Sequence, residues 1–225
     1  MNHKQEKSLS FFKIFLICLM HLAIWSIYTS LLFPVIRSNL GALGSELVSE
    51  AVKLVLWTMP AIVFVRHYSS DMFLTLREML TARFKPLPYL LLSSGVLVYS
   101  LATSIFINGK ITLNLPNPLS PLIGTVLLVG ITEEVLFRGF FMNALLRKTK
   151  AAFAVIISSL LFLVIHFPWW IYNGKFSDPL SALVDCVAVF ALGLIFGWTF
   201  LKSRNIFVSI FVHMLWNLLL TLFVV

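Results

Sequence analysis

Seven long apolar blocks, separated by short polar segments, dominate the sequence. About 20 apolar residues in a helix can cross the hydrocarbon core of a bilayer, where a spanning segment must satisfy its own backbone hydrogen bonds. Of the 225 residues, 60% are hydrophobic and only 12% are charged, whereas about a quarter of a soluble domain is charged. The sequence therefore predicts an all-α, polytopic integral membrane helix bundle with about seven transmembrane helices. The predicted spans are Phe11–Phe33, Leu47–Val65, Leu87–Ile107, Leu119–Leu146, Ala151–His166, Leu180–Leu201 and Ile206–Val225.

Prolines and mixed segments predict where these helices end or bend. Pro34 directly follows the first block and is expected to stop its helix, and Pro60 is expected to kink the second. Residues 66–85 mix charged and apolar side chains, which is typical of a helix lying in the membrane interface. The fourth block is long enough to tilt or to begin as a half-helix at Pro121.

The cations are distributed unevenly between the connecting segments. With the N-terminus in the cytoplasm, three cations lie outside, at Arg37, Lys110 and Lys175. Twelve then lie inside, which satisfies the positive-inside rule and predicts a multi-pass protein of the cell membrane with a cytoplasmic N-terminus. Because the net charge of +8 is divided into these short clusters, it indicates membrane topology and no nucleic-acid partner. The twelve are Lys4, Lys7, Lys13, Arg66, Arg77, Arg83, Lys85, Arg147, Lys148, Lys150, Lys202 and Arg204.

The fourth block contains three charges at membrane depth, Glu133, Glu134 and Arg138. A charge there costs about 3 kcal/mol on insertion scales, so each needs a partner or a function. Glu134 and Arg138 are four residues apart on one helix face and can form an ion pair that serves packing alone. Glu133 points to another face, where this arginine cannot satisfy it. We therefore interpret Glu133 as a functional residue.

Three further polar side chains lie at a similar depth in other spans. His166 ends the fifth block, and His213 and Asn217 share one helix face in the seventh. Counted from the nearest cytoplasmic cation, these residues and Glu133 fall within a slab of roughly 10 Å. The sequence therefore predicts one polar cavity between three helices. Membrane lipid is the partner that these spans predict, and the oligomeric state stays open.

Such a cavity suits the hydrolysis of a peptide bond. Glu133 could take a proton from water together with His166, and His213 and Asn217 could donate hydrogen bonds to a developing oxyanion. Alternatively, Glu133, His166 and His213 could bind zinc and leave one position for water. Carboxylates and histidines also form proton relays in transporters, although no paired inverted halves are evident here.

Three motifs in this half of the chain resemble those of one protease family. They are Glu-Glu-Val-Leu-Phe-Arg at 133–138, Phe-Leu-Val-Ile-His at 162–166 and His-Met-Leu-Trp-Asn at 213–217. Together they are similar to the EExxxR, FxxxH and HxxxN motifs of the CAAX-protease and bacteriocin-processing family of intramembrane proteases, the CPBP or Abi family. The type II CAAX prenyl endopeptidases belong to this family. All three lie within residues 118–225, the expected catalytic core, which forms one structural unit with the N-terminal helices and interfacial segment of 1–117.

The resemblance implies an intramembrane endopeptidase whose site opens toward the cytoplasm or the lipid. It implies that Glu133 and His166 activate water, that His213 and Asn217 form the oxyanion site, and that Glu134 and Arg138 are essential or supporting. Members of the family are linked to bacteriocin self-immunity and to peptide maturation. The runner-up function is a non-enzymatic membrane immunity or scaffold protein.

The family is often described as metalloproteases, so the resemblance also makes zinc a candidate cofactor. Against it, the chain has no His-Glu-x-x-His helix, and the helical partner of His213 is Asn217, a poor zinc ligand and a good hydrogen-bond donor. We therefore expect a glutamate-activated water with no essential cofactor.

Overall fold

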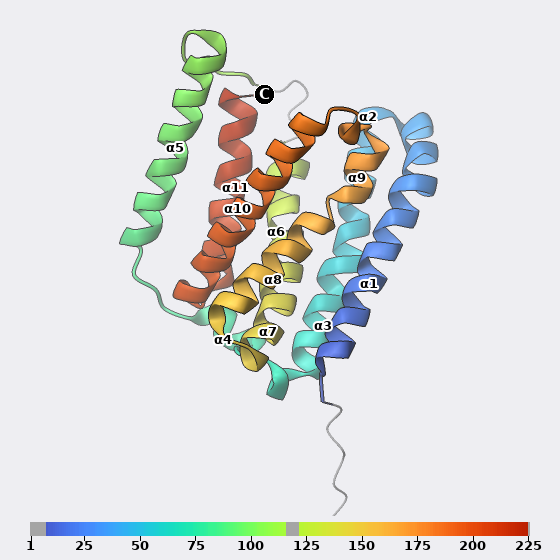
Figure 1. Ribbon diagram of the computed structural model, residues 1–225, viewed down its shortest axis with the longest axis vertical. Coiled ribbons are helices and arrows are strands. Elements are labelled where there is room, and N and C mark those ends of the chain that lie inside the picture. The colour runs from blue at the N-terminus through green and yellow to red at the C-terminus, as the bar shows by residue number, and fades with distance from the viewer. Residues whose placement is uncertain (1–7, 116–121, 225) are drawn as a thin grey trace, which may run out of the picture.

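Helices account for all the regular secondary structure that the computed structural model describes, in residues 8–115 and 122–224. Five of them are long and apolar enough to cross a membrane: Phe11–His67, Leu87–Asn108, Ala151–Tyr172, Pro179–Ser203 and Ile206–Phe223. The first reverses direction at Gly41 and so forms two helices, and a seventh, from Leu122 to Lys148, carries three charges. The protein is therefore a multi-pass helical membrane bundle, as predicted (Figure 1).

Most of these long helices consist of several elements joined end to end. The first helix is α1 (Phe11–Ile27), the π-helical η1 (Tyr28–Leu32) and the start of α2 (Phe33–Lys53). The second is the rest of α2, η2 (Leu54–Thr58) and α3 (Met59–His67). The third helix is α5 (Leu87–Asn108). The fourth consists of η4 (Leu122–Leu128), α6 (Val129–Glu134), η5 (Val135–Met142) and α7 (Asn143–Lys148), and the fifth of α8 (Ala151–Val164) and α9 (Phe167–Tyr172). The sixth is α10 (Pro179–Ser203) and the seventh is α11 (Ile206–Phe223).

The expectation that Pro34 stops the first helix is wrong. The helix continues past Pro34, and the chain reverses at Gly41, whose φ of 67° and ψ of −165° suit only glycine. Proline removes one backbone donor and crowds the preceding turn. Here that turn widens into η1, in which the N–H of Phe33 donates to the carbonyl of Tyr28, five residues back. At Pro60, where the sequence predicts a kink, the helix also widens into a π-helical turn. This turn is η2, which ends directly before α3, and Pro60 lies in the first turn of α3.

The predicted interfacial helix over 66–85 is also largely wrong. Only α4 (Leu76–Thr81) and the short 3-10 turn η3 (Ser69–Asp71) are helical after α3 ends. The reason is a tertiary contact: the backbone of residues 73–74 forms hydrogen bonds with Asn143 at the start of α7. Leu74 exchanges two hydrogen bonds of 2.8 Å with the Asn143 side chain, and the N–H of Phe73 donates to the Asn143 carbonyl. The proposed start of the fourth span at Leu119 and the half-helix at Pro121 lie outside the described residues.

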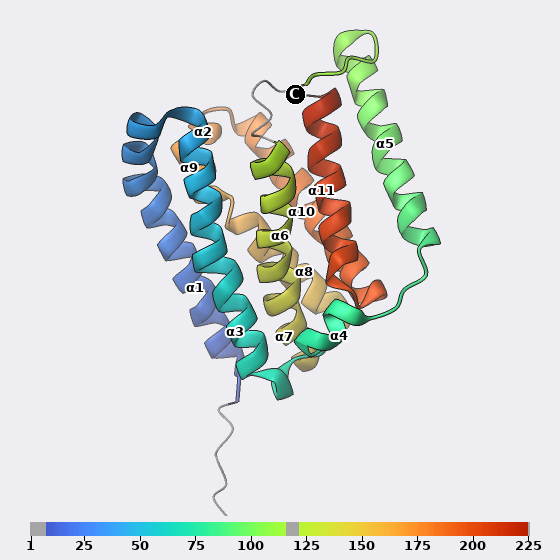
Figure 2. The same ribbon diagram turned by 180° about the vertical axis from the view of Figure 1, so that it is seen from behind.

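One end of the bundle collects the connections that carry most of the described cations. The Lys148 ammonium lies 2.9 Å from Asp71, and the Asn205 side chain donates to the carbonyl of Ala82 at 2.8 Å. These contacts bring the segments after α3, α7 and α10 together, as the lower end of Figure 2 shows. The reversals at Gly41 and Gly109 lie at the opposite end. We call the two ends the cationic end and the distal end.

Asp71 is expected to stabilise the cationic end in a pH-dependent way. The Leu9 backbone N–H, at 2.8 Å, and the Lys148 ammonium hold the pKa of the Asp71 carboxyl below its usual range. A lowered folded-state pKa stabilises the fold above the unfolded value of about 4, and the effect disappears as pH falls through the folded value. Asp71→Asn should therefore cost about 1 kcal/mol near neutral pH and less in acid, measured by thermal unfolding in detergent. An equal cost at pH 3 and pH 7 would contradict this.

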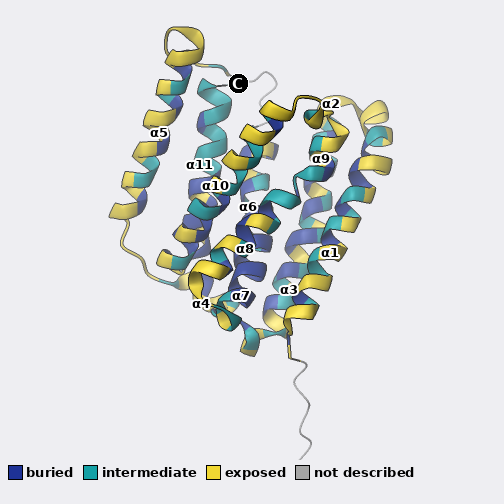
Figure 3. Cartoon of the chain, viewed as in Figure 1, coloured by how far each residue is buried: buried dark blue, intermediate teal, exposed yellow. Residues whose placement is uncertain are grey.

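The helix from Leu122 to Lys148 runs through the middle of the bundle. Between Thr132 and Leu145 every residue except Val135 is buried, and Figure 3 shows α6 and α7 mostly in dark blue. Apolar side chains on the outer helices are exposed instead, as suits a lipid-facing surface; Phe106 on α5 is an example. From Thr132 to Leu145 the fourth block is therefore enclosed by the other helices, and its three charges lie within the bundle.

Candidate active site

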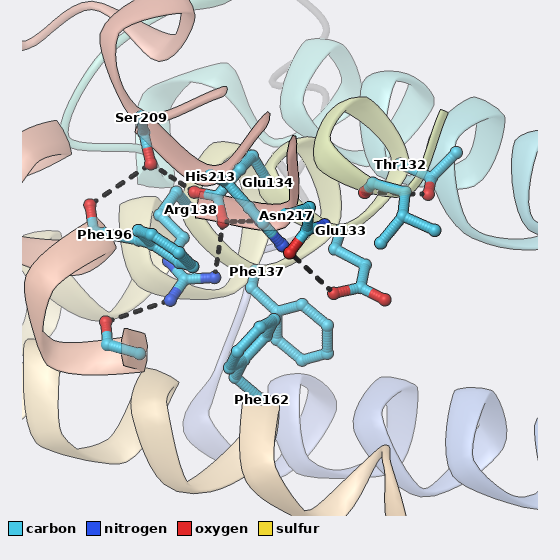
Figure 4. A network of polar contacts seen from close by, with 12 residues as sticks. Thr132, Glu133, Glu134, Phe137, Arg138, Phe162, Phe196, Ser209, His213 and Asn217 are labelled. Atoms are coloured by element: carbon cyan, nitrogen blue, oxygen red, sulfur yellow. Dashed lines mark hydrogen bonds and ion pairs between the residues drawn. The ribbon is translucent and has the colours of Figure 1, made fainter. Parts of the chain in front are cut away.

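Glu134 and Arg138 form a buried ion pair within the central helix. Their side chains are fully buried, and a guanidinium nitrogen lies 2.9 Å from the Glu134 carboxylate (Figure 4). A second nitrogen of Arg138 donates to the carbonyl of Gly193 on α10 at 2.9 Å. The guanidinium also lies over the Phe162 ring, 4.5 Å from its centroid. Arg138 therefore links its own helix to α8 and α10.

Glu134 also orients His213 on α11. The Ser209 hydroxyl donates to one Glu134 oxygen, and Nδ1 of His213 lies 3.0 Å from the other. Because an ionised carboxylate only accepts hydrogen bonds, Nδ1 of His213 carries a proton. The ring stacks on Phe196 at 4.4 Å between centroids. These contacts hold the opposite nitrogen, Nε2, 4.0 Å from Glu133.

Glu133 is buried but faces away from the ion pair. One of its oxygens lies 3.9 Å from the Lys53 ammonium and the other lies 4.0 Å from Nε2 of His213. The latter oxygen has no hydrogen-bond partner among the described residues. Lys53 is itself held 2.9 Å from Glu50, one helical turn earlier. Glu133 therefore keeps one oxygen free of protein hydrogen bonds among the described residues, close to both Lys53 and His213.

These groups line a cavity of about 540 Å³. Glu133, His166, His213 and Asn217 all lie in its wall, although they come from three separate helices. Nδ1 of His166 donates to the Phe162 carbonyl at 2.7 Å, which leaves Nε2 as the nitrogen available to the cavity. The Asn217 amide donates to the Thr125 carbonyl at 2.9 Å and keeps a second N–H. The wall also includes Trp25, Phe33, Arg37, Ala42, Ser45, Glu46, Ser49, Glu50, Lys53, Trp57, Thr125, Val129, Ile165 and Trp169.

The sequence analysis missed Glu50, Lys53 and Ser209 as members of this site. A signal was present for the first two, because a glutamate and a lysine three residues apart lie inside the apolar second block. Charges at that depth are functional candidates by default. For Ser209 the only indication in the sequence is its position four residues before His213, which places both side chains on the same helix face. Only the packing of α11 against α6 shows that it contacts Glu134.

The three suggested zinc ligands do not fit zinc in this arrangement. Among the described residues, no three His, Cys, Asp or Glu side chains converge to hold a metal ion, so Glu133, His166 and His213 do not form a ligand set. In addition, the Lys53 ammonium lies 3.9 Å from Glu133, where it would repel a cation.

Taken together, the fold and the site define a class: a multi-pass membrane helix bundle with a polar cavity enclosed among its helices. Residues 115–219 match the family model described as "Type II CAAX prenyl endopeptidase Rce1-like". The match includes all three motifs, so the resemblance to CAAX proteases is confirmed.

One similar protein is named "Putative membrane peptidase YdiL", from Bacillus subtilis (strain 168). It is 30% identical over 87 residues, which are 39% of this chain and 30% of that protein. The match thus spans less than a third of the relative. No solved structure matches the chain significantly.

Proposed function

We propose that this protein is an intramembrane endopeptidase that hydrolyses peptide bonds of membrane-associated peptides or proteins. The observation that carries the proposal is the position of Glu133, which faces the cavity between the Lys53 ammonium and Nε2 of His213. The family match over 115–219 supports the same activity. Processing of a peptide and self-immunity to a bacteriocin are the settings we propose for such a cleavage.

In the proposed reaction, Glu133 acts as the general base. Water bound between Glu133 and His166 loses a proton to Glu133, and its oxygen attacks the carbonyl carbon of the scissile bond. The Lys53 ammonium, 3.9 Å from Glu133, holds that side chain toward the cavity in which the water would lie. Glu133 then passes this proton to the free Nε2 of His166, which delivers it to the leaving amine as the C–N bond breaks, and Glu133 is ionised again.

His213 and Asn217 stabilise the negative charge that develops on the carbonyl oxygen. Nε2 of His213 faces the cavity 4.0 Å from Glu133, while Nδ1 is held 3.0 Å from Glu134, and in this role Nε2 donates an N–H to the oxyanion. The free N–H of Asn217 supplies a second donor. Glu134 and Arg138 act through His213, as positioning residues that fix its ring.

The decisive test compares membrane peptides from cells that express the wild type or Glu133→Ala. Mass spectrometry should find products of cleavage only with the wild type. Glu78→Gln is a control, because Glu78 caps α4 far from the cavity. If a cellular phenotype persists in Glu133→Ala without any product, the protein acts as a non-enzymatic scaffold.

We expect cleavage to persist without metal. Purified protein should be chelated exhaustively until metal analysis finds far less than one zinc per chain, and peptide hydrolysis should then stay near its starting rate. The reason is that the proposed base, acid and oxyanion donors are all side chains of this protein. Loss of hydrolysis that stoichiometric zinc restores, together with lost zinc binding in His213→Ala, would show that a metal mechanism operates instead.

A further inference from the structure

The cavity occupies the distal half of the bundle. Helix α11 starts at Ile206, at the cationic end, and Asn217 lies 11 residues further along it. Asn217 is therefore about 16 Å from the cationic end. Thr125 lies only three residues from Leu122, the distal end of its helix as described. Ala42 directly follows the distal reversal at Gly41. The lining residues thus extend from Glu133 to the distal end.

Exposure along α2 shows the direction in which the cavity opens. Ala42 is exposed, Glu46 is partly exposed, and Glu50 and Lys53 one and two turns deeper are buried. The same helix continues through η2, where Trp57 is only 2% exposed. Trp57 is the lining residue of this helix that lies nearest the cationic end. The exposed and partly exposed lining residues of α2, Ala42 and Glu46, thus lie at its distal end, whereas its lining residues near Glu133 are buried.

Tightly packed aromatic rings close the other direction. Trp57 contacts Phe137 edge to face at 6.5 Å between centroids, and Phe137 packs against Phe141 at 6.0 Å and against Phe162 at 5.3 Å. Phe137 and Phe141 are each 1% exposed. A peptide cannot pass through such a layer without unpacking these rings from one another.

We infer that the cavity takes its peptide substrate from the distal face of the membrane. By the positive-inside rule the cationic end is cytoplasmic, so the distal face is the outer one. The inference rests on the proposed function and names its substrate class, a peptide segment presented on the extracytoplasmic side. It differs from the site open toward the cytoplasm or the lipid that the motif resemblance implied.

The mouth of the cavity has groups suited to an extended peptide. Arg37 is exposed there and lies 3.3 Å from the Ser45 hydroxyl, and the Glu46 carboxylate accepts from Thr125 at 3.2 Å. One cation and one anion can bind the carbonyl and N–H groups of an incoming backbone. Phe33 and Trp169, which contact at 4.8 Å between centroids, form an aromatic wall beside them for apolar side chains.

Cysteine accessibility tests the direction of entry without requiring catalysis. In a background with Cys18→Ser and Cys186→Ser, single cysteines at Ser49→Cys and Thr125→Cys report on the cavity wall. Lys110→Cys and Lys150→Cys mark the distal and cationic ends. A membrane-impermeant, charged thiol reagent is applied to intact cells and, separately, to inside-out vesicles.

We expect the two cavity cysteines and Lys110→Cys to react at least tenfold faster in intact cells, and Lys150→Cys to react faster in the vesicles. Cavity cysteines that react from the same side as Lys150→Cys would overturn the inference. Reversed reactivity of the two end markers would also overturn it, because the distal face would then be cytoplasmic. If Ser49→Cys fails to accumulate, Thr125→Cys still gives the answer.

The same variants separate this inference from the proposed function. Peptide hydrolysis by the purified variants is measured before and after labelling, and the labelling is repeated with Glu133→Gln in the same chain. Outward labelling without any hydrolysis by the wild type would contradict the peptidase and leave the direction of entry standing. Hydrolysis combined with inward labelling would contradict only the direction.

Discussion

Glu133→Gln is expected to lower kcat by roughly 10²- to 10⁴-fold while the protein still accumulates in the membrane. Glutamine has nearly the same shape but cannot accept a proton from water. It also keeps an oxygen toward Lys53, which lies 3.9 Å from the present carboxylate. The measurement is peptide hydrolysis by purified protein in lipid nanodiscs, with accumulation followed by quantitative immunoblotting.

The matched control is Glu78→Gln, the same chemical change in the exposed capping box of α4. It should leave kcat within about twofold of the wild type, because surface changes of this kind alter stability by only a few tenths of a kcal/mol. Near wild-type turnover in Glu133→Gln would show that our assignment of the general base is wrong. A protein that no longer accumulates would instead show that Glu133 is needed for the fold.

Arg138→Met should destabilise the bundle by about 3–5 kcal/mol, because it leaves the Glu134 carboxylate buried without its cation. Ser209 and His213 still contact that carboxylate, but Arg138 is the only fixed cation in contact with it among the described residues. The Gly193 carbonyl loses its guanidinium donor as well. We expect low accumulation and a lower thermal midpoint in detergent, measured by size-exclusion chromatography after heating.

The double variant Arg138→Met/Glu134→Gln distinguishes an ion-pair effect from lost packing. It removes both charges, and glutamine can still bond to Ser209 and His213. We expect it to regain most of the lost stability, as buried pairs often tolerate joint neutralisation. Hydrolysis should stay low, because a neutral amide accepts a weaker hydrogen bond from Nδ1 of His213 than a carboxylate does and orients the ring less firmly. A double variant as unstable as Arg138→Met would mean that the guanidinium acts mainly through its packing on Phe162.

The sequence by itself determined the class of fold and the polar residues that meet in one cavity. Apolar blocks of spanning length require helices in a bilayer, and the spacing of Glu134 and Arg138 on one helix face follows from 3.6 residues per turn. The same rule places His213 and Asn217 together. Depth counting grouped Glu133 with His166 and His213, because helices that cross one membrane share a common length scale.

Only the tertiary structure decided how the helices face one another. Rotation of α2 toward α6 brings Lys53 to Glu133, and no periodicity within either helix specifies that contact. The backbone after α3 does not form the predicted helix, because Asn143, about 70 residues later, takes its hydrogen bonds. The direction in which the cavity opens likewise depends on the packing of Trp57, Phe137 and Phe141 from different helices. Such contacts join distant parts of the chain, and local patterns in a single sequence contain no record of them.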